Sequence, residues 1–336
     1  MRRQARIAQG GARGAALLAA IYADPRDHDL RAIYADWLVE QGDPRGEYIT
    51  LQLMRAHTDA QRARMHDLHA KHRLAWLGPI ADACIEHVWF DAGFVAGATI
   101  DIPRARRRIG AAAWSTLETI TLAASNEPVP IDVLDDPAMS ALTFVDGITG
   151  NQLAMLSRDR DPWGIAGLGF YRSVPANETF RILNLVDHYG LTELGFDSVI
   201  PPRLRELWTS DRSRGVARLR LLAPIAQLVD WLAAVPPTVA TIELANQRRA
   251  VGWTLVIARG SDGRFARLDA LHRARTIDDT APIGTLIDEV IASVPAGQLE
   301  RVTLRLVGSR AGAAELARLA AAIATRHPRA TTALPR

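Results

Sequence analysis

The sequence has almost no lysine and almost no cysteine. Lys71 is the only lysine, although lysine and arginine together number 40. A phosphate-binding loop that needs a lysine is therefore excluded, and Schiff-base chemistry would have to use Lys71. Because Cys84 is the only cysteine, an internal disulfide and a multi-cysteine zinc site are excluded as well. We therefore expect a reducing compartment, the cytoplasm.

Long apolar runs are also missing. No stretch approaches the roughly 18 consecutive apolar residues that a membrane-spanning helix needs. The basic start leads only to a short apolar stretch, Ala15 to Tyr22, which lacks a convincing cleavage site. We therefore expect no membrane partner. The hydrophobic content of 48% is nevertheless ample for a continuous core.

Known catalytic motifs are absent from the sequence: it has no G-x-S-x-G elbow, no H-E-x-x-H pair and no dinucleotide-binding glycine motif. Gly164, Gly167 and Gly169 have the wrong spacing for a nucleotide loop and are interpreted as small residues on a sheet surface. We therefore expect a protein that is not an enzyme, with no catalytic residues and no cofactor.

Three histidines form the best metal candidate. His66, His69 and His72 are three residues apart on a predicted helix. At about 100° per residue they spread over about 120° of the helix surface, which is poor convergence for one ion. We expect structural or solvated histidines and no metal.

A short pattern recurs along the chain: an apolar residue, two spacers, an apolar residue, one spacer and a third apolar residue. Six successive starts lie 22, 26, 26, 25 and 23 residues apart before one long gap. A period of roughly 20–29 residues with this hexamer is the signature of a leucine-rich-repeat solenoid, in which each repeat gives one strand to a curved parallel sheet. The hexamers begin at Leu117, Met139, Ile165, Leu191, Val216, Val239 and Leu299.

The expected fold is therefore α/β. It comprises a small all-helical N-terminal cap over residues 1–80, an irregular leucine-rich-repeat-like solenoid over 81–310, and a C-terminal capping helix and tail over 311–336. A β-hairpin near residues 252–270, around Gly260 to Gly263, is expected to interrupt the array. Helices are also predicted over residues 151–158, 178–188, 202–210, 225–235 and 282–294.

The N-terminal segment shows clear helix signals. Residues at i, i+3, i+4, i+7 and i+8 form one apolar stripe, and Thr58 followed by Gln61 is typical of a capping box. Gly42 suits the end of the preceding helix, and Gly78-Pro79 suits the end of the one that Thr58 begins. The apolar stripe consists of Leu30, Ile33, Tyr34, Trp37 and Leu38.

Residues 17–52 resemble the bacterial repeat-companion domain, a short module found ahead of leucine-rich and other repeats. The strongest matches are Tyr34-Ala35-Asp36-Trp37-Leu38 and Gly42-Asp43-Pro44-Arg45-Gly46-Glu47. Downstream, Trp76-Leu77-Gly78-Pro79 is similar to the element that introduces the degenerate repeats of that family. Arg26 and His28 stand where acidic residues are usual. The resemblance implies the helical cap and the repeats, and it implies no activity.

Two charged clusters need interpretation. Asp36, Asp43, Arg45 and Glu47 surround one turn, where we expect a structural role, with an Asp36–Arg45 ion pair, or a docking surface. Arg104, Arg106, Arg107 and Arg108 form the densest basic run. The chain has 37 acidic against 40 basic residues, with no broad basic stripe, so nucleic-acid binding through this run is the minor alternative.

The spacers of each hexamer are expected to project from the concave face of the sheet, because successive strand residues alternate faces. We therefore expect a non-enzymatic scaffold that binds an unidentified protein or peptide there. An enzyme with an unrecognised site near the N-terminal helical junction is the alternative. The predicted partner-binding residues are Thr119, Thr121, Thr143, Tyr171, Glu193, Asp197, Arg218, Arg220, Thr241, Glu243, Arg301 and Arg305.

Overall fold

The computed structural model describes residues 2–54, 57–123, 128–156, 164–171, 178–197, 205–222, 235–245, 252–273, 288, 291–292, 294–307 and 313–334. The chain forms two compact units. The first comprises Met1–Ser125 and Pro130–Thr143, and the second comprises Asn126–Val129 and Phe144–Arg336. The predicted division at residues 80 and 310 is a different one and stays a prediction.

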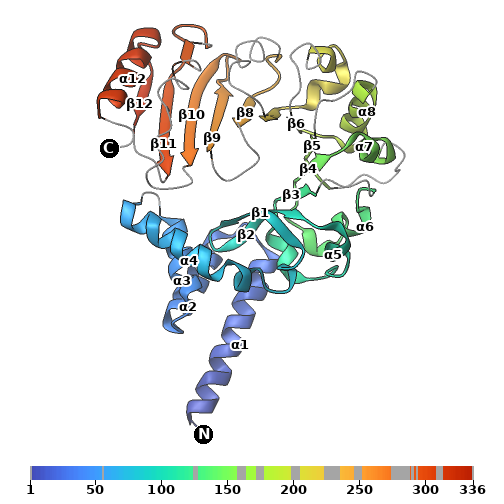
Figure 1. Ribbon diagram of the computed structural model, residues 1–336, viewed down its shortest axis with the longest axis vertical. Helices are drawn as coiled ribbons and strands as arrows, with labels where there is room; N and C mark the ends of the chain where they lie inside the picture. Colours follow the sequence, from blue (N-terminus) through green and yellow to red (C-terminus); the bar gives the residue numbers. More distant parts are fainter. Residues whose placement is uncertain are drawn as a thin grey trace. The chain divides into compact units, whose positions relative to one another are not determined.

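The first unit begins with four helices and continues with three strands (Figure 1). The helices are α1 (Arg2–Ala23), α2 (His28–Glu40), α3 (Pro44–Leu53) and α4 (Asp59–Leu77). The strands are β1 (Cys84–Asp91), β2 (Phe94–Ile100) and β3 (Thr119–Leu122). Short helical segments complete the unit: η1 (Gly78–Ile80), α5 (Ile102–Arg106), η2 (Ala112–Thr116), α6 (Ile131–Leu134) and η3 (Pro137–Met139).

Side-chain caps fix where these helices begin. Asp27 accepts hydrogen bonds from the first backbone N–H groups of α2, and Asp43 does the same for α3, where Pro44 occupies the first turn. The capping box predicted from Thr58 and Gln61 is confirmed at the start of α4. Each cap satisfies amide groups that the helix itself leaves without partners.

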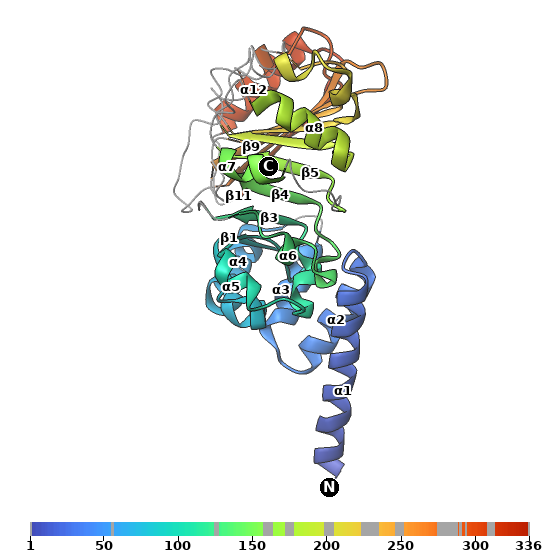
Figure 2. The same cartoon turned by 90° about the vertical axis from the view of Figure 1, so that its right-hand side faces the viewer.

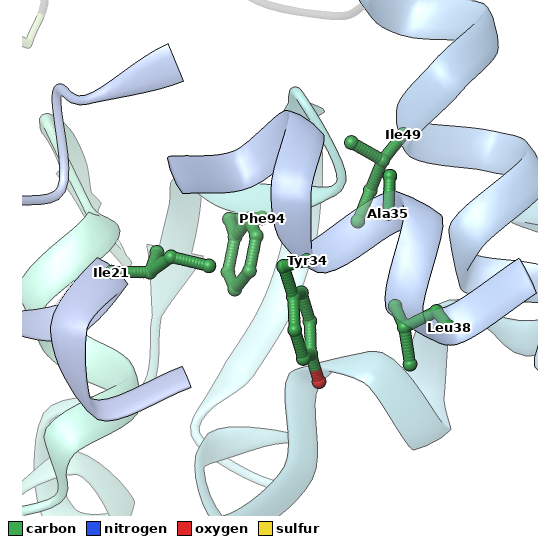
Figure 3. Packing of buried hydrophobic residues seen from close by; sticks show 6 residues of the cluster. All are labelled: Ile21, Tyr34, Ala35, Leu38, Ile49 and Phe94. Carbon is green, nitrogen blue, oxygen red and sulfur yellow. The ribbon is translucent and has the colours of Figure 1, made fainter. Parts of the chain in front are cut away.

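Three helices pack around the start of β2. Figure 3 shows six buried side chains that form this core. The predicted stripe on α2 is correct for Tyr34 and Leu38, whereas Ile33 is 47% exposed. Gly93 (φ +80°) allows the close approach, since a Cβ there would lie 2.0 Å from a carbon of Ile49. The six side chains are Ile21, Tyr34, Ala35, Leu38, Ile49 and Phe94.

The second unit contains nine strands and the helices that follow some of them in its described part. Its strands are β4 (Phe144–Ile148), β5 (Gly167–Phe170), β6 (Glu193–Asp197), β7 (Arg218–Leu222), β8 (Thr241–Ala245), β9 (Gly252–Arg259), β10 (Phe265–Arg273), β11 (Arg301–Val307) and β12 (Thr331–Ala333). Its helical segments are α7 (Gly150–Leu156), α8 (Thr179–Tyr189), η5 (Asp211–Gly215) and α12 (Ala313–Arg326).

The strands form one open, mostly parallel 12-stranded sheet whose spatial order follows the chain from β1 to β12. Strands β4 to β8 pair in parallel, and so do β2 with β3 and β10 to β12. Strand β9 is antiparallel to both β8 and β10. The predicted hairpin is therefore present: both of its strands join the sheet, and β9 interrupts the parallel order there.

One face of the sheet in the second unit is apolar. Leu168, Leu194, Leu219 and Ile242 lie in register on consecutive strands and are at most 1% exposed. Helices α7 and α8 lie beside β4 and β5 in both views (Figures 1 and 2). Gly190, in the left-handed conformation, caps the end of α8. The α/β class is thus confirmed, whereas the finer assignment to a solenoid stays a prediction.

Some predicted elements lie partly or wholly outside the described residues. The helix predicted over 225–235 lies outside them except at its last residue. Most of the helix predicted over 282–294 also lies outside them. The helices predicted at 151–158 and 178–188 correspond to α7 and α8. Among the described helices, none has the length and hydropathy that a bilayer crossing requires.

Candidate functional site

The face of the sheet opposite this apolar face carries the spacer residues of the hexamers, and we call it the spacer face. Because successive strand residues alternate faces, parallel pairing in register places spacers of neighbouring strands side by side. Glu193 on β6 lies beside Arg218 on β7, which lies beside Thr241 on β8. Two residues further along, Arg220 lies beside Glu243. Acids and bases therefore alternate across three strands.

These side chains form an ion-pair network. An Nη of Arg218 donates to a carboxylate oxygen of Glu243 at 3.0 Å. The Nε of Arg218 lies 3.5 Å from a Glu193 oxygen, and the Nε of Arg220 lies 3.9 Å from Glu243 and also contacts Glu193. The Glu193 side chain is only 13% exposed and that of Arg218 is 42% exposed. The network is half-buried, so solvent screens it less than an ordinary surface pair.

An aromatic ring supports the network from one side. The guanidinium carbon of Arg220 lies 4.2 Å from the centre of the Phe144 ring, a cation–π geometry. Phe144 on β4 is in register with Gly167, a spacer position, and is 2% exposed. Phe144, the third apolar residue of the hexamer that begins at Met139, therefore lies on the spacer face and not on the apolar face. Val145 takes that place beside Leu168.

Three glycines make room for the Phe144 ring. A Cβ at Gly167 would lie 2.6 Å from a ring carbon, one at Gly195 would lie 2.9 Å from the ring tip Cζ, and one at Gly169 would lie 3.1 Å from the same atom. Real Cβ atoms essentially never approach another atom more closely than 3.0 Å, and a contact of 3.1 Å is already tighter than most. The glycines of β5 and β6 therefore form a flat floor, which agrees with the interpretation of Gly167 and Gly169 as small sheet-surface residues.

The other predicted partner-binding residues are more dispersed. In the second unit, Tyr171 and Asp197 are half-buried at the ends of β5 and β6, and Arg301 and Arg305 are exposed on β11. Three more belong to the first unit. Thr119 and Thr121 are half-buried on β3, and the hydroxyl of Thr143 donates to the carbonyl of Glu118 at 3.1 Å.

The charged turn of the first unit is structural in its contacts. Asp43 caps α3 by accepting from the amide of Arg45 at 2.8 Å. The Nε of Arg45 donates to the Gly93 carbonyl at 3.0 Å, and its guanidinium carbon lies 4.3 Å from the Phe94 ring centre. Burial lowers the pKa of Arg45. The turn thus joins α3 to the β1–β2 hairpin.

The remaining acids of that turn do not converge on Arg45. Glu47 forms a two-bond ion pair with Arg64 of α4 at 2.8 and 2.6 Å, and hydrogen bonding to Arg64 lowers the Glu47 pKa. Asp36 is exposed and forms no ion pair within the part of the chain that the structure describes. The predicted Asp36–Arg45 pair is therefore wrong, because Arg45 turns to Gly93 and Phe94 instead.

The histidines of α4 pack against aromatic rings. His69 lies 6.0 Å from Tyr48 and 5.2 Å from Phe90 between ring centres, and burial lowers its pKa. His72 stacks on Trp76 at 5.6 Å. Across the described residues, no group of three His, Cys, Asp or Glu side chains could hold a metal ion.

The arginine run is largely neutralised by local carboxylates. Arg108 donates to both oxygens of Asp82 at 3.0 and 2.9 Å, and Arg106 donates to Asp132 at 3.0 Å. Arg104 lies 3.9 Å from Asp101. Paired guanidinium groups have less to offer a polyanion, so these contacts do not favour a nucleic-acid surface.

Sequence reasoning named all four residues of the ion-pair network on β6 to β8 but missed Phe144, and it also missed the Arg267–Asp269 pair on β10. The signal available was the set of glycines at alternate positions 167 and 169, repeated at 195, since glycine inside a strand marks a close approach. Comparisons of the chain with protein-family profiles, characterised proteins and solved structures find no match. A function for this chain therefore rests on its own residues and geometry.

Proposed function

We propose that this protein is a non-enzymatic interaction scaffold that binds a protein or peptide on the spacer face. In this proposal the sheet belongs to an irregular leucine-rich-repeat-like solenoid, and residues 17–52 are a repeat-companion domain that caps it. The chain-ordered strands and the parallel pairing of β4 to β8 support the solenoid, because stacked repeats place each strand beside the previous one.

The observation that carries the proposal is the pre-ordered pair of arginines. Arg218 and Arg220 lie between Glu193 and Glu243, and Arg220 also rests on Phe144. Immobilising a long side chain on binding costs about 0.5–1.5 kcal/mol. Because these arginines already have fixed partners, a ligand that contacts them avoids much of that cost.

The composition of the face favours a polypeptide ligand. Arginine and aromatic side chains are common anchors of protein interfaces. Carboxylates and guanidinium groups alternate here, so donors and acceptors lie close together. A peptide backbone, which carries both kinds of group, matches such a surface better than a uniformly charged polymer.

Site-specific photo-cross-linking in the native cell tests the proposal. A benzoylphenylalanine at Thr241, a half-buried spacer beside Arg218, should capture a discrete protein. The matched control is Thr209, an exposed threonine whose hydroxyl bonds to Glu206 within its own turn. The captured protein, once purified, should bind Arg220→Ala more weakly than the unaltered chain.

Two outcomes would count against the proposal. Equal capture from Thr209 and Thr241 would place the contact away from the spacer face. Unchanged affinity of Arg220→Ala, with unfolding by urea also unchanged, would show that the pre-ordered arginine contributes nothing to binding.

A further inference from the structure

A second group of arginines lies on the spacer face beyond the ion-pair network. In the parallel register of β10 and β11, Arg267 lies beside Arg301, Asp269 beside Thr303, and Leu271 beside Arg305. All six side chains are on the face opposite the buried Leu268, Val302 and Leu304. We call Arg267, Arg301 and Arg305 the arginine stripe.

The stripe has more positive charge than its neighbours neutralise. Asp269 lies 3.0 Å from the Nε of Arg267. Arg301 and Arg305 are exposed and have no ion-pair partner among the residues described. Like charges directly opposite each other on neighbouring strands, such as Arg267 and Arg301, disfavour pairing. The excess positive charge of the arginine stripe therefore attracts an anion.

The network around Glu243 does not supply that anion. Strand β9 separates β8 from β10, and its spacers Thr254, Val256 and Ala258 are uncharged. Each strand step is about 4.8 Å, so Glu243 is about 14 Å from β11, beyond the Debye length of about 8 Å. On the other side of β11, the strand partner of Arg301 is Thr331 of β12, which is uncharged.

The surroundings of the stripe favour a peptide over a nucleic acid. Val256 and Leu271 are half-buried on the same face, so apolar contacts lie beside the charges. Proteins that bind single-stranded nucleic acids stack the bases on aromatic side chains. None of the spacer residues named above on β9, β10 and β11 is aromatic. Guanidinium forks bind the carboxylates of such a peptide with matched geometry, as they also bind phosphates.

We propose that the spacer positions of β10 and β11 bind an extended acidic peptide, with its carboxylates on Arg301 and Arg305. The two arginines are four positions apart, which is about 13 Å along the strand. An extended peptide that carries acids four residues apart has the same spacing. The inference rests on the proposed function and names the partner chemistry of that face.

Fluorescence anisotropy with the full chain tests the inference. The probe is a short labelled peptide that alternates glutamate with valine, and the comparison peptide has lysine in place of glutamate. We expect binding of the acidic peptide only, with an affinity that falls as salt rises. The double change Arg301→Glu and Arg305→Glu should lower that affinity about tenfold or more.

Matched variants separate charge from folding. Arg64→Glu with Arg214→Glu makes the same change of net charge at exposed positions outside the stripe, and it should leave the affinity for the acidic peptide unchanged. Arg301→Gln with Arg305→Gln should lower the affinity less than the charge reversal does, with the melting temperature retained.

Several results would overturn the inference. Equal binding of both peptides, an equal loss in the matched variant, or tighter binding of single-stranded DNA than of the acidic peptide would each do so. If these occur while Thr241 still captures a partner, only the acidic chemistry is wrong. Loss of both readouts would reject the proposed function too.

Discussion

Gly195→Ala tests the most specific contact of the spacer face, the one between the Phe144 ring and its glycine floor. The new methyl group would lie 2.9 Å from the Cζ of Phe144 and 3.1 Å from the Cα of Gly169. Overpacking of this kind costs about 1–3 kcal/mol. Alanine also has fewer conformations than glycine in the unfolded chain, and this difference stabilises the folded state by about 0.4–1 kcal/mol. We therefore expect a net loss of about 1–2 kcal/mol in the free energy of unfolding.

A double-mutant cycle assigns that loss to the ring. Leucine has no atom at the position of Cζ, so Phe144→Leu should remove most of the penalty of Gly195→Ala. The expected coupling is about 1 kcal/mol, within the range for residues in contact. Urea unfolding followed by far-UV circular dichroism measures the four chains, with midpoints compared at a common slope.

Gly164→Ala is the matched control, because no atom lies within 4 Å of its Cβ position. It should leave stability unchanged or raise it by a few tenths of a kcal/mol. The reasoning would be refuted if Gly195→Ala were as harmless as Gly164→Ala. Equal destabilisation by Gly195→Ala with and without the Phe144→Leu substitution would refute it as well.

Three further predictions concern the first unit. Arg45→Lys should lower stability by about 1–3 kcal/mol in urea unfolding, because an ammonium group cannot both donate to Gly93 as the Nε does and stack on Phe94. Cys84, whose pKa burial raises to about 12, should resist iodoacetamide at about pH 8 in the folded chain and react after unfolding, as mass spectrometry would show. Burial, with help from neighbouring positive charges, lowers the pKa of His69, so the unfolded chain takes up the proton first and stability falls as pH drops below about 6.5. His69→Gln should lose less stability between about pH 8 and about pH 5, measured by urea midpoints.

The repeated hexamer predicted most of the sheet because its apolar positions reflect strand alternation. Ile120, Leu168, Leu194, Leu219 and Ile242 are all buried, at the middle position of their hexamers. The same alternation placed Glu193, Arg218, Arg220 and Glu243 on one face. Whether the side chains of these four residues touch depends on the register between strands about 25 residues apart in sequence. A hexamer whose period varies does not determine that register.

The pattern failed where the backbone departs from regular pairing. Strand β4 has a register shift between Val145 and Ile148, with Gly147 at φ +85°. Because Val145 and not Leu142 lies beside Leu168, the repeat is three residues out of phase with the predicted hexamer, and Phe144 lies on the spacer face. Strand β1 was missed for a similar reason, because repeated register shifts and the left-handed His87 destroy its alternation.

Long-range contacts of the charged turn could not be predicted either. Arg45 bonds to a carbonyl 48 residues away, whereas sequence reasoning favoured the nearby carboxylate of Asp36. Local proximity is a poor guide when a guanidinium can stack on a buried ring, because the aromatic face and a backbone oxygen replace the missing carboxylate. The helix caps, which depend on neighbours three residues apart, were predictable.

The short final strand limits how the sheet can grow. Strand β12 spans Thr331–Ala333, is exposed, and ends the strand order in the described part of the chain. A sheet edge recruits further strands through its row of backbone donors and acceptors, and a very short edge strand is a common defence against such templating. Here three residues leave little backbone for a second copy to extend. Growth into fibres through this edge is therefore disfavoured, while the spacer face stays available for side-chain recognition.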